Sequence, residues 1–282
     1  MSEVVTIGDA TLYLGDCRDV LHGLSNVDHV VSDPPYEAHM HAAKRGEKVH
    51  GSIRRIRLDG HANPPPVDFT SIDDIRDWAA AEAVRLADGW VLLFCTPEGV
   101  APWRDAIEAT GAKYKRACVW VKPDAAPQFN GQGPAMGAEM FVAAWAGQGY
   151  SRWNAGGKRG VYTHNVNTGR YGAGPEHPRG GGHPTEKPLT LMAELIADFT
   201  QPGDLILDPF MGSGTTGVAC LKDGRRFIGI EQKPEYFAIA CRRMREARIN
   251  GELFQAPPAK AVQPVLMDMP KQKRPVDARG AA

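Results

Sequence analysis

Four consecutive residues, Asp33, Pro34, Pro35 and Tyr36, could do chemistry at the end of an apolar run. The two prolines lack backbone N–H groups and hold the chain extended, so the carbonyl groups beside them stay outside helix and sheet hydrogen bonding. The segment therefore offers a carboxylate, a free backbone carbonyl and an aromatic ring within one rigid corner. Such a corner can accept hydrogen bonds from a bound group and present a flat surface beside it.

A glycine-rich loop, DPFMGSGTTG at residues 208–217, follows another apolar run and opens a helical pattern. Its glycines have the G-x-G-x-x-G spacing of nucleotide-cofactor loops, and Glu231 ends the next apolar run at about the distance where an acid binds ribose hydroxyls. Asp208 at the first strand tip would repel the pyrophosphate of a dinucleotide but suits the ammonium group of S-adenosylmethionine. No lysine follows the glycines, which excludes a nucleoside-triphosphate loop. The charges therefore predict S-adenosylmethionine as the cofactor.

Short apolar runs alternate with helical patterns from residue 10 to about 248, as in a mostly parallel sheet flanked by helices. We expect strands over residues 11–16, 29–33, 89–95, 115–121, 139–146, 204–208 and 226–231. We expect helices, where apolar residues recur every three or four positions, over residues 71–87, 102–111, 188–199, 214–224 and 235–249. Too few residues follow Glu231 to complete a wound sheet. The missing strands must come from upstream, so the strand order is permuted.

The totals bound the class of protein. The 282 residues suffice for one large domain, which we assign to residues 1–254, and the Pro- and Ala-rich residues 255–282 are expected to be a disordered tail. Because 33 Lys and Arg balance 33 Asp and Glu, any contact with nucleic acid must come from local patches. The five dispersed cysteines predict buried thiols, and the histidines show no metal-ligand spacing. No run reaches the ~18 apolar residues of a membrane span, and we expect a cytoplasmic protein.

Four motifs occur in a telling order: DPPY at 33–36, HPTEKP at 183–188, DPFMGSGTT at 208–216 and GIE at 229–231. On these motifs the chain resembles the amino-methylating DNA methyltransferases of the permuted β type, over roughly residues 10–248. The resemblance implies an α/β, Rossmann-like S-adenosylmethionine-dependent methyltransferase fold, with a mostly parallel seven-stranded sheet of circularly permuted order. It also implies methyl transfer to an exocyclic amino group in double-stranded DNA, by base flipping and direct attack without a covalent enzyme intermediate.

The resemblance assigns roles to these motifs. Asp33 and the carbonyl of Pro34 would grip the amino hydrogens, Pro35 would keep the corner rigid, and stacking on Tyr36 would contribute roughly 1–3 kcal/mol. In similar enzymes the acid at Asp16 contacts the cofactor's adenine and HPTEKP faces its methionine end, although a helix cap and a helix start explain these segments about as well. The predicted cofactor-binding residues are Asp16, His183, Thr185, Lys187, Asp208, Phe210, Gly212, Ser213, Gly214, Thr215 and Glu231.

Two polar stretches break the alternation of strands and helices and are candidates for DNA contact. Residues 37–68 follow the DPPY corner directly, and residues 147–182 lie where similar enzymes carry their target-recognition region. A solvated, mobile face is the alternative for the first stretch. The shortness of the second suggests a short recognition sequence or help from a second subunit. The predicted DNA-binding residues are Lys44, Arg45, Lys48, Arg54, Arg55, Arg57, Arg152, Lys158, Arg159 and Arg170.

The corner alone does not select the base, because adenine and cytosine both carry an amino group beside a ring nitrogen. In similar enzymes an aspartate opening this motif accompanies adenine more often, so we predict adenine, with the cytosine amino group as the alternative. A nicotinamide oxidoreductase, an inactive DNA-binding relative and an RNA methyltransferase are more remote. The charge of Asp208 argues against the oxidoreductase, and the intact motifs argue against an inactive relative. No added RNA-binding module is found, which argues against the RNA methyltransferase. A homodimer and a companion restriction enzyme are both compatible with this function.

Overall fold

The strands of the chain, in a computed structural model that describes residues 3–37, 71–125, 133–166 and 186–254, form one mixed sheet. They are β1 (Glu3–Ile7), β2 (Ala10–Leu14), β3 (His29–Ser32), β4 (Trp90–Cys95), β5 (Lys113–Val121), β6 (Ala138–Trp145), β7 (Val161–Thr163), β8 (Leu205–Asp208) and β9 (Arg226–Glu231). Their order across the described sheet is β1-β2-β9-β8-β3-β4-β6-β5-β7. Neighbours from β2 to β4 pair in parallel, whereas β6 runs antiparallel to both β4 and β5.

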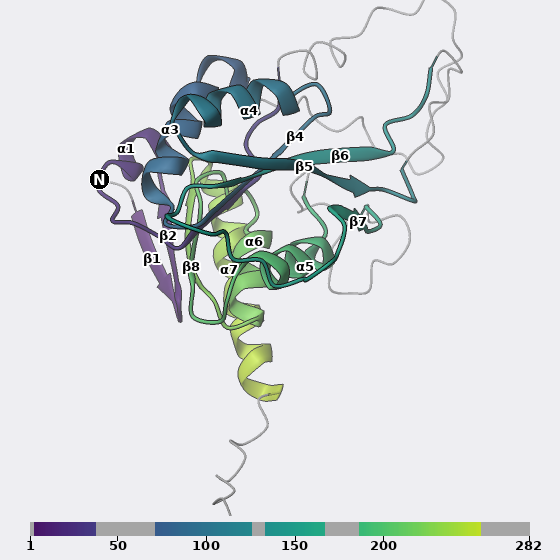
Figure 1. The fold of residues 1–282 in the computed structure, drawn as a ribbon. Coiled ribbons are helices and arrows are strands. Elements are labelled where there is room, and N and C mark those ends of the chain that lie inside the picture. The colour runs from purple at the N-terminus through teal and green to yellow at the C-terminus, as the bar shows by residue number, and fades with distance from the viewer. Residues whose placement is uncertain (1–2, 38–70, 126–132, 167–185, 255–282) are drawn as a thin grey trace, which may run out of the picture.

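Helices cover both faces of this sheet (Figure 1). On one face lie α1 (Cys17–Leu21), α3 (Arg76–Leu86) and α4 (Val100–Ala109), with the short 3₁₀ turn η1 (Ile72–Asp74) before α3. On the other lie α5 (Leu189–Phe199), α6 (Thr215–Lys222) and α7 (Pro234–Phe254). Two hydrophobic clusters, one on each face, fill the space between helices and strands, which is why β3 and β4 are buried throughout. Among the described residues, no helix is both long and apolar enough to cross a membrane.

The predicted fold is confirmed, and two short edge strands extend it. The seven predicted strands form the uninterrupted centre of the sheet. β1 was not predicted because, within the described sheet, it pairs with β2 alone and buries a single side chain, Ile7. β7 was not predicted because three residues are too short for an alternating pattern to show. The predicted tail, residues 255–282, lies outside the described residues.

The chain changes direction across the sheet between β8 and β3. From β8 the chain passes through α6 to β9 on one side, whereas from β3 it reaches β4 on the other side through α3. In α/β sheets such a reversal leaves a crevice at the carboxyl ends of the two strands, where ligands bind. The permuted order therefore brings the DPPY corner and the glycine-rich loop side by side. The hydroxyl of Ser32 donates to Asp208 Oδ1 across this boundary at 2.6 Å.

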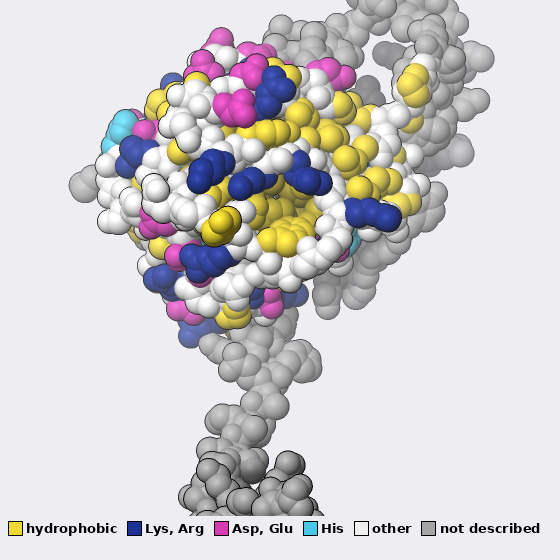
Figure 2. All heavy atoms as spheres, in the orientation of Figure 1, with side chains coloured by type: hydrophobic (Ala, Val, Ile, Leu, Met, Phe, Trp, Pro, Cys, Tyr) yellow, Lys and Arg dark blue, Asp and Glu magenta, His cyan; other side chains and the backbone are white. Residues whose placement is uncertain are grey.

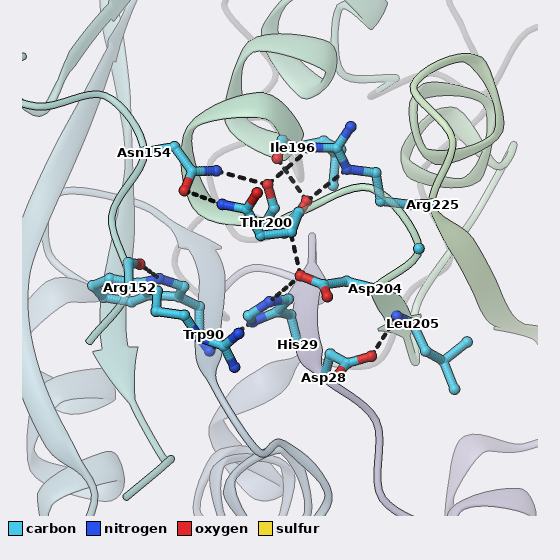
Figure 3. Close-up of polar contacts among 12 residues, drawn as sticks. Asp28, His29, Trp90, Arg152, Asn154, Ile196, Thr200, Asp204, Leu205 and Arg225 are labelled. Atoms are coloured by element: carbon cyan, nitrogen blue, oxygen red, sulfur yellow. Dashed lines mark hydrogen bonds and ion pairs between the residues drawn. The ribbon is translucent and has the colours of Figure 1, made fainter. Parts of the chain in front are cut away.

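A polar cluster fastens the opposite, amino ends of the same strands (Figure 3). Buried His29 accepts a hydrogen bond at Nδ1 from the backbone N–H of Trp90, 2.9 Å away, and its Nε2 lies 3.0 Å from Asp204 Oδ2. The first contact requires an unprotonated Nδ1, so the ring is neutral with its hydrogen on Nε2. Asp28 accepts from the N–H of Leu205 at 2.7 Å. Three neighbouring strands, β3, β4 and β8, are thereby held in register below the crevice.

Candidate active site

The DPPY corner follows β3 directly and has no regular secondary structure, as its prolines predict. Asp33 Oδ2 accepts a hydrogen bond from the ammonium of Lys187 at 2.5 Å. Its other oxygen, Oδ1, is buried and has no hydrogen-bond partner among the described residues. Burial raises the pKa of Asp33, against the opposing effect of Lys187. The corner therefore holds one unused acceptor, Asp33 Oδ1. A buried acceptor without a hydrogen-bond partner destabilises the folded protein.

Lys187, predicted to face the cofactor, lies in the DPPY corner. Besides Asp33, its ammonium donates to the hydroxyl of Tyr36 at 3.0 Å and lies 3.3 Å from Glu139 Oε2. It also stands 5.1 Å from the ring centres of Tyr36 and Phe94. Tyr36 in turn donates to Glu139 Oε2 at 2.7 Å. Glu139, on β6, is thus a member of the corner that no motif indicated, and the predicted contact of Lys187 with the cofactor stays a prediction.

Glu37, the residue that follows the DPPY motif, is held in place by contacts of its side chain. It belongs to the stretch predicted as a DNA-contacting loop, yet its side chain is buried. Oε2 accepts from the hydroxyl of Thr96 at 2.9 Å, and Oε1 lies 3.6 Å from the guanidinium of Arg76 on α3. A Cβ at Gly99 would stand 2.0 Å from Oε1, so glycine makes room for this carboxylate. The first residue of the loop is therefore anchored to Thr96, directly after β4, and to α3.

The glycine-rich loop has the geometry that its spacing predicts. Gly212 and Gly214 have φ of +53° and +80°, values that favour glycine. Glu231 at the end of β9 closes the loop from the other side, because Oε2 accepts from the N–H of Gly212 at 3.1 Å and Oε1 accepts from that of Lys233 at 2.8 Å. Burial raises the pKa of Glu231. The acid predicted to bind ribose therefore also holds the loop.

The third glycine of the motif, Gly217, has a packing role. A Cβ there would stand 2.2 Å from Met244 Cε on α7 and 2.6 Å from the ring of Phe227 on β9. Any larger residue would force the side chain of Met244 or Phe227 to move, so glycine lets α6 lie close to β9 and α7. The spacing therefore serves two loop conformations and one close contact between a helix and its neighbours.

Asp208 points into the protein beneath the loop. Oδ1 accepts from Ser32 at 2.6 Å and from the N–H of Phe210 at 3.1 Å, while Oδ2 accepts from Thr216 at 2.8 Å. Burial raises its pKa to about 6, against the lowering effect of these donors. Asp208 thus anchors the turn between β8 and α6, and its predicted contact with a cofactor ammonium group stays a prediction.

Arg243 on α7 clamps the glycine-rich loop, and no motif indicated it. One of its nitrogens donates to the carbonyl and the hydroxyl of Ser213, both at 2.8 Å, and to Thr215 Oγ1 at 3.1 Å. Another donates to Glu186 Oε1 at 2.5 Å. The clamp joins the loop to the segment before α5, and Glu186 balances its charge.

These features fit a cofactor with an ammonium group and a ribose better than a phosphate-bearing one. Asp208 is buried beneath the loop and Glu231 stands beside it, each at a strand tip. Residues 209–214 contain no lysine or arginine, and the guanidinium that binds the loop, that of Arg243, is paired with Glu186. Phosphate sites normally place cations or unopposed helix N-termini there. The donor set therefore agrees with the prediction of S-adenosylmethionine.

Other predicted site residues fall into two groups. Asp16 is the N-cap of α1, where Oδ1 accepts from the N–H of Arg18 at 2.9 Å, so the helix-cap interpretation is confirmed while a contact with adenine stays a prediction. The hydrogen bonds to Arg18 lower the pKa of Asp16. The following predicted residues lie outside the described part of the chain: His183, Thr185, Lys44, Arg45, Lys48, Arg54, Arg55, Arg57 and Arg170.

Three predicted DNA-contacting residues, Arg152, Lys158 and Arg159, belong to the described segment before β7. Lys158 forms ion pairs with Glu194, at 2.6 Å, and Asp198, both on α5, so its charge is already balanced within the protein. Figure 2 shows that Lys and Arg side chains also gather around a hollow floored by hydrophobic side chains on the face turned to the viewer. Contact of any of these groups with DNA stays a prediction.

Comparison with known proteins agrees with this geometry. The family model described as DNA methylase matches residues 27–242. The type II methyltransferase M.Cfr9I of Citrobacter freundii is 30% identical over 284 residues, which cover 88% of this chain and 92% of that protein. The type II methyltransferase M.XycI of Xanthomonas campestris pv. cyanopsidis is 35% identical over 285 residues, with the same coverage of both chains.

Solved structures show the same fold. The complex of M1.HpyAVI with SAM has a TM-score of 0.61 and 26% identity, covering 83% of this chain and 98% of that chain. The cytosine-N4-specific PvuII DNA methyltransferase has a TM-score of 0.60 at 17% identity, a likeness of fold, covering 87% of this chain and 94% of that chain. The family match, the relatives and the site agree, and the chain belongs to the DNA methylase family, as an amino-methylating member of the permuted β type.

Proposed function

We propose that this protein is a site-specific DNA methyltransferase that transfers a methyl group from S-adenosylmethionine to the exocyclic amino group of adenine in double-stranded DNA. The observation that carries the proposal is the unused acceptor of the corner, Asp33 Oδ1, which is buried and has no hydrogen-bond partner among the described residues. A target amino group would satisfy this oxygen. The crevice between β3 and β8 would place that group next to the glycine-rich loop.

Two acceptors of the corner act on the amino group together. An exocyclic amine is a poor nucleophile because its lone pair is delocalised into the ring. When Asp33 Oδ1 and the carbonyl of Pro34 each accept one of its hydrogens, the nitrogen is drawn toward a pyramidal geometry that localises the lone pair. Tyr36 offers a stacking face for a base rotated out of the duplex.

When bound, S-adenosylmethionine supplies an electrophilic methyl carbon on a sulfonium sulfur. Asp33 would take up the proton that the amino nitrogen loses on accepting this methyl group, and the sulfur would keep the electron pair of its broken bond to carbon. The raised pKa of Asp33 suits this uptake of a proton. Glu231, the glycine-rich loop and the Arg243 clamp would hold the methyl donor, so that most of the rate enhancement comes from positioning.

Replacement of Asp33 by alanine tests these roles. We expect methyl transfer to fall by roughly 10²–10⁴-fold, the usual contribution of a positioned acid or base. Affinity for S-adenosylmethionine, measured by calorimetry, should stay within about twofold, because Asp33 is assigned to the amino group alone. Loss of cofactor binding together with activity would show that Asp33 belongs to the cofactor site.

Adenine is proposed over cytosine because an aspartate, Asp33, opens the motif, and in similar enzymes this aspartate accompanies adenine more often. The decisive measurement is mass spectrometry of nucleosides from duplex DNA treated with the protein and S-adenosylmethionine. Amino-methylated deoxyadenosine is expected. Amino-methylated deoxycytidine alone would replace adenine by the cytosine alternative and leave the roles of the corner unchanged.

The relatives M.Cfr9I and M.XycI are type II methyltransferases, which supports a place for this protein in a restriction–modification system. In that setting double-stranded DNA is the substrate, and a companion restriction enzyme would cut the unmethylated sequence. That companion and a homodimer stay predictions. Incubation of unmethylated plasmid with the protein, followed by sequencing that detects methylated bases, would give the recognition sequence.

A further inference from the structure

Glu139 on β6 binds two groups of the corner, Tyr36 and Lys187, together with Lys122. Its Oε2 accepts from the hydroxyl of Tyr36 at 2.7 Å and lies 3.3 Å from the ammonium of Lys187. Its Oε1 accepts from Lys122, at the end of β5. The side chain is 13% exposed, and it reaches the corner from a strand antiparallel to β4. Its position explains how the orientation of the corner is fixed.

We propose that Glu139 is a positioning residue for methyl transfer, which holds Tyr36 and Lys187 so that Asp33 presents Oδ1, and not Oδ2, to the target amino group. The inference rests on the proposed function, because it takes Asp33 as the group that binds the amine. It adds a residue that touches neither the base nor the methyl donor and acts through its neighbours.

The hydrogen-bond directions in the corner support this role. The single hydroxyl hydrogen of Tyr36 goes to Glu139, and the phenolic oxygen accepts from Lys187. The Lys187 ammonium donates to the Tyr36 hydroxyl and to Asp33 Oδ2, and it also lies beside Glu139. Each donor of this network thus has an assigned acceptor. Asp33 Oδ1 is an oxygen of the corner that accepts no hydrogen bond from the described residues.

The charges of the corner support the same role. Two carboxylates, Asp33 and Glu139, are matched by two ammonium groups, those of Lys187 and Lys122. Burial opposes ionisation of Glu139, but Lys187 and Lys122 lower its pKa to about 2, so it stays charged across the working range of pH. Removing one member of a buried, balanced set leaves an uncompensated charge, which is far costlier than the loss of a surface pair.

Two substitutions should move the ionisation of Asp33 in opposite directions. Glu139→Gln removes a negative neighbour, so the pKa of Asp33 should fall. Lys187→Met removes its positive neighbour, so the pKa should rise. The other groups that act on Asp33 from neighbouring elements, the Tyr36 hydroxyl, Asp208 on β8 and the Cys95 thiol on β4, are present in both variants. A merely structural defect would not produce opposite shifts.

The test is the single-turnover rate of methyl transfer, with S-adenosylmethionine prebound, measured on duplex DNA from pH 5 to pH 9. The acid limb of the rate profile should move to lower pH in Glu139→Gln and to higher pH in Lys187→Met. Glu139→Ala should lower the plateau rate by roughly 10²-fold, the cost of a misplacement of about 1 Å. Glu139→Gln should recover most of that loss, because its amide oxygen still accepts from Tyr36.

Glu82→Gln is the matched control. Glu82 on α3 is also 13% exposed and is bound by Arg85, but it has no contact with the corner, so rate and pH profile should equal those of the parent. The proposal would be overturned if both acid limbs moved in the same direction or if neither moved. It would also be overturned if Glu139→Ala kept the plateau rate of the parent. Should Glu139→Ala fail to fold, the two pH profiles decide. Full activity of Asp33→Ala would instead refute the proposed function on which the inference rests.

Discussion

Replacing His29 by glutamine should destabilise the protein by an amount that depends on pH. At pH 8 the variant loses the acceptor for the backbone N–H of Trp90, since a glutamine amide that still reaches Asp204 cannot also replace Nδ1. A buried donor without a partner costs about 1–3 kcal/mol. For a domain of 150–250 residues, where 1 kcal/mol corresponds to about 2–4 °C, the melting temperature should fall by roughly 2–12 °C.

The sign of the pH dependence follows from the pKa of His29, which burial lowers below its ordinary value of 6.5. As the pH falls below about 6.5 the unfolded chain binds a proton before the folded chain does. The stability that neutral His29 contributes is therefore present above pH 6.5 and is lost toward its folded pKa, at up to about 1.4 kcal/mol per pH unit. The gap between the parent and the variant should narrow as the pH falls from 8 to 5.

Asp208 has the opposite dependence in the same range. Its folded pKa of about 6 lies above its ordinary value of 3.8, so its contribution to stability is present at low pH and is lost as the pH rises through 6. Both proteins carry Asp208, and its effect cancels in their difference. Urea unfolding of both proteins at pH 8, 7, 6 and 5 gives that difference directly, with His22→Gln, at an exposed position, as the control. A gap of constant size at all four values would refute the assignment of a neutral, buried His29.

Two further outcomes are expected at the proposed cofactor site. Replacing Glu231 by alanine should weaken S-adenosylmethionine binding by about 1.5–3 kcal/mol, the value of a hydrogen bond to a charged group. If calorimetry shows an unchanged dissociation constant, Glu231 does not bind the cofactor and serves only to hold the loop. Replacing Gly217 by alanine should cost about 1–3 kcal/mol of overpacking against α7 and β9, reduced by the roughly 0.5–1 kcal/mol that alanine gains in a helix. Thermal melting measures this cost, with Gly157→Ala, where a Cβ meets no atom within 4 Å, as the control; equal melting temperatures for the two variants would contradict the close approach of α6.

The sequence allowed prediction of those parts of the site that lie at strand ends. Asp33 and Asp208 could be brought together because the carboxyl ends of parallel strands meet at one edge, and glycine spacing carried the conformation of the loop. Glu139 and Arg243 could not be predicted, since a single glutamate in a strand and one arginine among several on α7 have no local signal. Lys187 was selected by its motif, but its contact with Asp33 depends on how α5 docks against the sheet.

The pairing of β3 with β8 also has a consequence for how the protein is made. Ser32 and Asp208, which join the two halves of the site, are separated by 176 positions along the chain. At about 5–20 residues per second, a ribosome needs roughly 9–35 s to synthesise that interval. During this time the apolar strand β3 lacks a neighbour on one side, and an unpaired strand of this kind favours aggregation. Nascent chains that end before β8 would therefore be inactive and would depend on chaperones, so the yield of enzyme should respond to the speed of translation.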